Sequence, residues 1–177
     1  MKKNVIVFGL IAGIIVSGFM IFSIARFYDN PDFTGGMIMG YAAMLIAFSF
    51  VFVGIKNFRD KYNDGVITFG KAFKTGFYIT LIASTMYVVV WLIEYYCFIP
   101  DFMDKYSEHI MNEAKTSGAS AAEISSKVAE MDKYKEMYKN PLFVILLTYA
   151  EILPLGLVIT LISALILKRK PKATAVA

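Results

Sequence analysis

The sequence predicts an all-α, polytopic membrane protein: four transmembrane helices in a bundle, plus an extracytoplasmic helical hairpin between the third and the fourth. Its 177 residues are 58% apolar and 18% charged, whereas soluble domains are about 45–50% apolar and about 25% charged. The apolar residues are concentrated in four stretches, each longer than the roughly 20 residues with which a helix crosses the hydrocarbon core. These stretches are Asn4–Ala25, Thr34–Ile55, Thr75–Pro100 and Asn140–Leu167.

A chain of this length has room for one domain, so we predict a single membrane domain over residues 1–177. The segment between the third and fourth spans, residues 101–140, is the only sizeable polar part and is predicted to lie outside the membrane. The spans themselves are predicted at about residues 5–25, 37–56, 75–99 and 141–167.

The basic residues predict the orientation. Eleven of the 18 Lys and Arg residues lie in the N-terminal segment, in the loop between the second and third spans, and in the C-terminal segment. Basic residues in short loops stay on the cytoplasmic side during insertion, so both termini are predicted to be cytoplasmic. These residues are Lys2, Lys3, Lys56, Arg59, Lys61, Lys71, Lys74, Lys168, Arg169, Lys170 and Lys172.

The first span carries Gly9, Gly13 and Ser17 at four-residue spacing. Residues four apart share one helix face, and small side chains on that face let two helices approach closely. An alternative is that Gly9 and Gly13 form the seam of a homodimer. A cleaved signal peptide ending near Ala25 is a weaker alternative, because the apolar run exceeds the roughly 7–15 residues of a signal-peptide core.

Small residues recur in the other three spans. Gly36 and Gly40 lie in the second, Gly76 in the third and Gly156 in the fourth. Lipid provides no hydrophobic drive for helices to associate, so close van der Waals packing must hold them together. The repeated pattern therefore predicts a compact bundle rather than four separate anchors.

Turn and cap residues predict where the helices begin. The Asn63–Gly65 segment is a strong turn signal, and Thr68 is a plausible N-cap. From Phe69 the third helix could run to Ile99. Pro141, which follows Asn140, suits the first position of the fourth helix.

The polar segment predicts two helices. Phe102, Tyr106 and Ile110 mark one face of the first helix, which ends near Gly118. Ser120–Glu123 then fits a capping box at the start of the second. We expect an αα-hairpin whose apolar faces pack together or lie on the lipid surface.

Three blocks of sequence, GIKNFRDKYNDGVITFGKAFKTG, FIPDFMDKY and LTYAEILPLGLVITLISALIL, resemble the family numbered 4199 among the domains of unknown function. The blocks fall in matching order, and the resemblance covers nearly the whole chain. It implies a small four-helix protein of the bacterial inner membrane, of a kind found mainly in Bacteroidota and without an established biochemical role. The family supplies no catalytic residues to transfer, so the resemblance supports the architecture and not a mechanism.

Two carboxylates, Glu94 and Glu151, lie inside predicted spans. An acid at the centre of a membrane helix costs about 2.5–3.5 kcal/mol on insertion scales, so such residues generally face the bundle interior, a partner or water. Pro154 adds to the evidence for a polar site here, because it leaves the carbonyl of Ala150 without its helical N–H donor. The candidate intramembrane polar site comprises Glu94, Glu151, Arg26, Thr148, Tyr149 and Pro154.

Two interpretations of these acids stay open. One is a protonatable or cation-binding site. The other, which we weight more heavily, is a structural hydrogen bond or an ion pair in which Arg26 is the counter-ion of either acid.

The aromatic residues around the outer end of the third helix are predicted to form an interfacial belt, in preference to a ligand pocket. The single histidine, His109, and the single cysteine, Cys97, match no metal-site pattern, so neither a metal nor another cofactor is expected. The belt residues are Tyr87, Trp91, Tyr95, Tyr96, Phe98 and Phe102.

We favour a non-enzymatic membrane protein that acts through contacts with the lipid bilayer, with a second copy or with another membrane protein. The alternative is a small proton- or cation-coupled transporter that uses Glu94 and Glu151. A membrane enzyme is least favoured, because acids, His and Cys do not cluster at one depth. Nucleic-acid binding is not expected despite the net charge of +4, since the positive-inside rule accounts for the charges.

Overall fold

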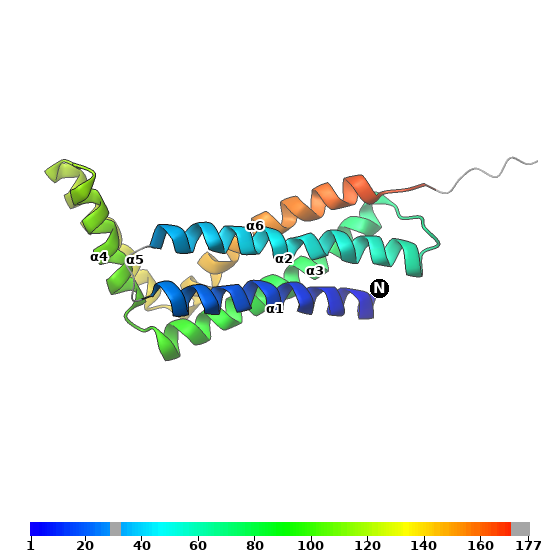
Figure 1. The fold of residues 1–177 in the computed structure, drawn as a ribbon, viewed down its shortest axis with the longest axis horizontal. Helices are drawn as coiled ribbons and strands as arrows, with labels where there is room; N and C mark the ends of the chain where they lie inside the picture. The colour runs from blue at the N-terminus through cyan, green and yellow to red at the C-terminus, as the bar shows by residue number, and fades with distance from the viewer. Residues whose placement is uncertain (29–32, 171–177) are drawn as a thin grey trace, which may run out of the picture.

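Four long helices form an up-and-down bundle, and a helical hairpin covers one end of it (Figure 1). The arrangement is taken from a computed structural model that describes residues 1–28 and 33–170. The helices are α1 (Lys2–Phe27), α2 (Phe33–Tyr62), α3 (Phe69–Ile93) with its π-helical continuation η1 (Glu94–Phe98), α4 (Phe102–Thr116), α5 (Ala121–Tyr138) and α6 (Pro141–Leu167).

Four of these helices, α1, α2, α3 with η1, and α6, are long and apolar enough to cross a membrane. The chain is therefore a polytopic helical membrane protein, as the sequence predicts. Large apolar side chains such as Ile14 and Ile166 remain 63% and 64% exposed on the bundle surface. Such exposure suits a surface whose solvent is lipid.

The packing order of the bundle places α1 and α6 at opposite corners. α1 packs on α2 and α3, and α6 packs on the same two helices. In Figure 1 the N-terminus, the α2–α3 loop and the end of α6 lie together at one end, here called the terminal end. The α4–α5 hairpin lies at the opposite end, here called the hairpin end.

The half of the bundle nearer the terminal end is closely packed. Phe48, Val51 and Ile79 are fully buried there. A Cβ atom added to Gly156 would lie 2.4 Å from Cγ2 of Thr80 and 2.8 Å from Cζ of Phe48. The helix backbones therefore approach as closely as the small-residue pattern predicts.

Gly76 packs in the same way, since an added Cβ would lie 2.8 Å from Cγ2 of Thr160. Gly54, which the four-residue pattern did not single out, also belongs to this layer. A Cβ added there would lie 2.5 Å from Cδ1 of Ile79.

The packing role of Gly9 and Gly13 is confirmed, but the proposed homodimer seam is wrong. A Cβ on Gly9 would lie 2.8 Å from Cβ of Ile82, and one on Gly13 would lie 2.4 Å from Sδ of Met86. Both contacts are with α3 of the same chain, so this face of α1 is already covered.

The packing prediction is wrong for Gly40. An added Cβ there would meet nothing within 4 Å, because the helices separate toward the hairpin end. The surroundings of Gly36 lie outside the residues whose side-chain environment the structure describes.

Polar contacts also join helices within the bundle. The hydroxyls of Thr80 and Thr160 lie 2.9 Å apart and link α3 to α6, and both residues are fully buried. Asn4 Nδ2 donates to Asn57 Oδ1 at 2.9 Å and links α1 to α2. Interhelical hydrogen bonds of this kind contribute on the order of 0.6 kcal/mol each in membrane proteins.

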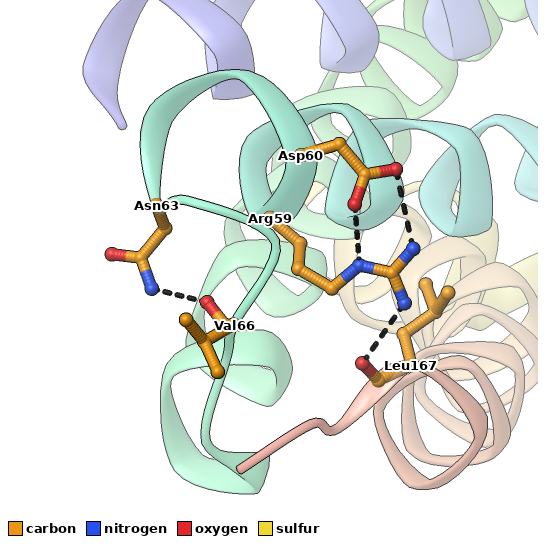
Figure 2. A network of polar contacts seen from close by, with 5 residues as sticks. All are labelled: Arg59, Asp60, Asn63, Val66 and Leu167. Carbon is orange, nitrogen blue, oxygen red and sulfur yellow. Dashed lines mark hydrogen bonds and ion pairs between the residues drawn. The ribbon is translucent and has the colours of Figure 1, made fainter. Parts of the chain in front are cut away.

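At the terminal end, Arg59 caps the last turn of α6 (Figure 2). Its Nη1 donates to the carbonyl of Leu167 at 3.3 Å, and its Nε lies 2.6 Å from Oδ1 of Asp60. A cation at a helix C-terminus satisfies otherwise unpaired carbonyls and interacts favourably with the helix dipole. Arg59 thereby ties the end of α2 to the end of α6.

The predicted turn between α2 and α3 is confirmed, with φ values of 50° at Asp64 and 75° at Gly65. Asn63 donates to the carbonyl of Val66 across it (Figure 2). Beyond the turn, Ile67 and Arg169 exchange two backbone hydrogen bonds of 3.0 and 2.8 Å. The chain that leaves α6 is therefore paired with the α2–α3 loop.

All three predicted helix starts are confirmed. Thr68 Oγ1 accepts from the N–H of Lys71 at 3.4 Å at the start of α3. Ser120 and Glu123 form both halves of a capping box on α5. Asn140 caps α6, in which Pro141 takes the first position.

Candidate functional site: a cavity beneath the hairpin

A cavity of about 640 Å³ lies in the half of the bundle nearer the hairpin end, between the spanning helices and the α4–α5 hairpin. All four membrane-crossing helices and both hairpin helices contribute to its lining. On each spanning helix, the lining residue nearest the terminal end marks the floor. These floor residues are Val16, Met44, Tyr87 and Glu151.

The cavity is closed toward the terminal end by the packed half of the bundle. One turn beyond Met44, the side chain of Phe48 is fully buried and reaches the backbone of α6 at Gly156. The Thr80–Thr160 hydroxyl pair lies in the same packed region. The cavity is therefore one-sided: it lies in the hairpin half and does not extend into the packed half.

The hairpin is fastened to α1 through Tyr28. The Tyr28 hydroxyl donates to the Asp101 carboxylate, and Nζ of Lys105 lies 3.8 Å from the centre of the Tyr28 ring. The hydrogen bond from Tyr28 is the main reason that the pKa of Asp101 is lowered. Both contacts hold the start of α4 against the end of α1.

Ring contacts fasten the hairpin to α3 and η1. Trp91 meets Phe102 edge-on at 5.0 Å between ring centres, and Tyr95 meets Tyr138 at 5.4 Å. Edge-to-face pairs at these distances are favourable beyond the area they bury. The roof of the cavity is thus fixed on two sides.

Eight aromatic side chains line the cavity. The predicted belt is therefore only partly right: Tyr96 and Phe98 are 43% and 72% exposed, but Tyr87, Trp91 and Phe102 face the cavity. The others come from α1, α2, α4 and α5, which no local sequence signal relates to one another. The full set is Tyr28, Tyr41, Tyr87, Trp91, Phe102, Tyr106, Tyr134 and Tyr138.

Of the six residues in the predicted polar site, two reach the cavity: Thr148 and Glu151. Thr148 is buried and donates to the carbonyl of Val144 at 2.7 Å. Glu151 is exposed at this surface, and protein surrounds most of its carboxylate. Both facts fit a group that faces a hollow.

The other predicted residues lie elsewhere. The hydroxyl of Tyr149 lies 2.8 Å from that of Thr85 on α3, so it does not cluster with Thr148. Glu94 begins η1, and Arg26 is exposed in the last turn of α1; neither is among the lining residues of the cavity. Pro154 is exposed on α6 beyond the cavity floor.

The expected grouping of Glu94 with Glu151 is therefore not formed around this cavity. The two acids carry the same signal in sequence, a carboxylate in an apolar helix. Their positions differ because the rotation of each helix decides which residues face the hollow, and that rotation depends on long-range packing.

The carboxylate of Glu151 acts electrostatically on the tyrosines around it. Burial raises the pKa of Tyr138 to about 12, and the charge of Glu151 adds to the rise. Tyr87, which also interacts with Glu151, has Tyr41 and Tyr138 as further electrostatic neighbours. One carboxylate and three tyrosines from α2, α3, α5 and α6 thus form one group, here called the acid–tyrosine cluster.

Two charged residues of α5, Lys127 and Glu130, line the cavity at its roof. They are opposite in sign and lie near one another on the same helix. Apart from these two residues and Glu151, the lining is apolar or aromatic, with Ser23 and Thr148 as neutral polar exceptions. The site can therefore enclose a largely apolar molecule and orient one polar group of it.

No curated protein and no solved structure matches the chain. A family model described as "Protein of unknown function (DUF4199)" matches residues 7–169. The match spans all four membrane-crossing helices and the hairpin. The resemblance inferred from the three sequence blocks is thus confirmed, and the chain belongs to the DUF4199 family of proteins of unknown function.

Proposed function

We propose that this protein is a non-enzymatic membrane protein that binds a small molecule in the cavity beneath its hairpin. The one-sided, aromatic-lined cavity carries this proposal. Ligand sites in proteins are typically clefts of about 300–1,000 Å³, mostly apolar and with a few placed polar groups. The cavity of about 640 Å³ has that size and that lining.

The lining favours binding over catalysis. Neither His109 nor Cys97 is among its residues, and the titratable groups that face it are tyrosines, Glu151, Lys127 and Glu130. The predicted contacts with lipid, with a second copy or with another membrane protein are compatible with this role. They would use the exposed apolar surfaces of the four spans rather than the cavity.

We further propose that the protein lies in the bacterial inner membrane with the hairpin on the extracytoplasmic side. The basic residues at the terminal end support this orientation, since short basic segments remain cytoplasmic. The cavity would then take its ligand from the extracytoplasmic side or from the outer leaflet.

The binding proposal can be tested with the only tryptophan of the chain, Trp91, which lines the cavity. We expect the neutral dye N-phenyl-1-naphthylamine to change Trp91 emission saturably in purified protein in lipid nanodiscs. Gly40→Leu should abolish the saturable phase, because Gly40 lines the cavity and has nothing within 4 Å of an added Cβ. The new side chain would therefore fill the hollow without a clash.

Gly18→Leu is the matched control. Gly18 also has open space around an added Cβ, but it is not a lining residue of the cavity. This variant should bind the dye like the wild type. Saturable binding that survives Gly40→Leu, or no saturable binding in any form, would overturn the proposal.

A transporter is the second candidate. A cavity closed toward one end, with a carboxylate at its floor, is the geometry expected of a carrier open to one side. Reconstituted protein should then show pH-dependent cation flux that Glu151→Gln removes. The earlier hypothesis assigned this role to Glu94 as well, so Glu94→Gln should be measured beside it. Flux equal to that of empty liposomes at every pH would exclude transport.

A further inference from the structure

We infer that the ligand of the cavity is an organic cation, a quaternary or protonated amine, held by the Glu151 carboxylate and the faces of the surrounding rings. This inference rests on the proposed binding function and specifies the ligand class. It depends on three features of the acid–tyrosine cluster: an unpaired charge, its position and the rings around it.

The first feature is the lack of a partner for the carboxylate. Among the residues that the structure describes, none forms a hydrogen bond or an ion pair with Glu151. Lys127 is the one basic residue in the lining, and its electrostatic partner is Glu123 on its own helix. A charge held at membrane depth is costly unless something compensates it, so a positive group at the cavity floor would stabilise the ionised carboxylate.

The second feature is the position of the charge. Glu151 is the lining residue of α6 nearest the packed half of the bundle, and Tyr87 holds the same place on α3. A molecule that entered from the hairpin end would reach the carboxylate last. Its remaining atoms would then lie against Trp91, Met20 and the other apolar residues of the lining.

The third feature is the ring environment. Tyr41, Tyr87 and Tyr138 line the same cavity as the carboxylate and come from three helices, and Tyr87 and Tyr138 interact with it electrostatically. The faces of aromatic rings carry negative potential, and they attract amines and quaternary ammonium groups. One ring of the lining already does so within the chain, since Lys105 Nζ lies 3.8 Å from the centre of Tyr28.

Other ligand classes fit less well. A hard metal ion needs about six oxygen ligands in contact, whereas the floor of the cavity offers one carboxylate. An anion would be repelled by Glu151 and by the ring faces. A neutral molecule would leave the carboxylate without compensation.

Two ions of nearly the same shape and opposite charge provide the test. Tetraphenylphosphonium and tetraphenylborate can each be titrated into the full chain in nanodiscs of zwitterionic lipid, with Trp91 emission as the signal. Wild-type protein should bind tetraphenylphosphonium more tightly by about tenfold or more, the effect of one favourable charge contact. Glu151→Gln should remove this preference.

Glu94→Gln is the control, because Glu94 also lies in a membrane-crossing helix but does not line the cavity. It should retain the wild-type preference. Tyr87→Phe should retain most of the cation affinity, since the ring face remains, whereas Tyr87→Leu should weaken it.

The outcomes separate the two proposals. The cation inference would be overturned if the wild type bound both ions equally, or if Glu151→Gln left the cation preference unchanged. Saturable binding of the neutral dye would still support the proposed function in either case. Failure of the dye and of both ions to bind saturably would overturn the proposed function itself. The comparison of the two ions on the wild type does not depend on any variant folding.

Discussion

The glycines of this bundle differ in how closely other helices pack against them, although the sequence does not distinguish them. Gly156 lies where α6 meets both α2 and α3, and a Cβ there would lie 2.4 Å from Thr80. At Gly18 and Gly40 an added Cβ would meet nothing within 4 Å. Gly40 lines the hollow near the hairpin end, whereas Gly18 is exposed on the bundle surface.

We expect Gly156→Ala to destabilise the protein. Overpacking a tight core costs about 1–3 kcal/mol, which exceeds the roughly 1 kcal/mol that alanine gains in helix propensity. Thr80 cannot move away freely, because its hydroxyl is bonded to that of Thr160 at 2.9 Å. The midpoint of thermal unfolding, followed by circular dichroism in detergent, should fall.

Gly18→Ala is the reference for that measurement, since an added Cβ there meets nothing within 4 Å. Its midpoint should equal or exceed that of the wild type. Equal midpoints for the two variants would contradict the close approach of α6 to α3.

At the scale of elements, the hairpin is specified by strong local signals. The capping box of α5 is complete: the Ser120 N–H donates to Glu123 Oε2 at 2.7 Å, and the Glu123 N–H donates to Ser120 Oγ at 3.3 Å. Gly118, with a φ of 76°, ends the preceding turn. An ion pair of 2.8 Å between Asp104 and Lys135 then joins α4 to α5.

We expect Glu123 to titrate below the ordinary glutamate pKa of 4.5. The hydrogen bond from the Ser120 N–H is the main cause, followed by that from the Ser120 hydroxyl. Because the folded pKa is lowered, the cap stabilises α5 fully above pH 4.5 and loses its effect as the pH falls through the folded value. Carboxyl carbon chemical shifts of labelled glutamate would give the midpoint.

Ser120→Ala should move this midpoint upward, and Ser126→Ala, an exposed change within the same helix, should leave it unchanged. Glu123→Gln assigns the signal. A Glu123 midpoint that Ser120→Ala does not move would show that the Ser120 hydroxyl does not contribute to holding the carboxylate.

The π-helix at the end of α3 is an element that no sequence pattern indicated. The third helix was expected to continue from Phe69 to Ile99, and it does run almost that far, but Glu94–Phe98 adopts the wider π turn. The Ile99 N–H closes this turn on the carbonyl of Glu94 at 2.9 Å. Short π segments are often found at functional sites, and this one lies beside the rings that hold the hairpin.

At the scale of the whole molecule, the arrangement separates a packed end from an open end. The terminal end is tied by Arg59 (Figure 2), and also by the backbone pairing of Ile67 with Arg169. The hairpin end is held by contacts around its rim, and the space between them is the cavity. A site that is rigid on one side and hollow on the other can admit a ligand without unfolding the bundle.

We expect the two ends to lie on opposite sides of the membrane, with the terminal end cytoplasmic. In a Cys97→Ser background, Glu113→Cys on the hairpin and Lys61→Cys at the end of α2 both place an exposed thiol for labelling. A membrane-impermeant maleimide applied to right-side-out vesicles should label only the hairpin position. Lys61→Cys should react after permeabilisation.

The reverse pattern would contradict the proposed orientation. Labelling of both positions from one side would contradict the four-span arrangement, because these residues lie at opposite ends of the bundle.

Sequence by itself determined the four spans, the hairpin and the residues at which the helices begin. These features follow from local causes: the length of apolar runs, the angles that Asp64 and Gly65 accept, and caps such as Ser120 that act within one turn. None of them requires knowledge of which helices are neighbours.

Tertiary structure alone decided the site. It determined that Gly9 packs on α3 of the same chain, that Gly40 faces a hollow, and that Glu151 reaches the cavity while Glu94 does not. Each outcome depends on how a helix is rotated and where it diverges from its neighbours. Those quantities are set by the summed contacts of the whole bundle, so residues such as Tyr41 and Tyr138, distant in sequence, meet around one carboxylate only in the folded protein.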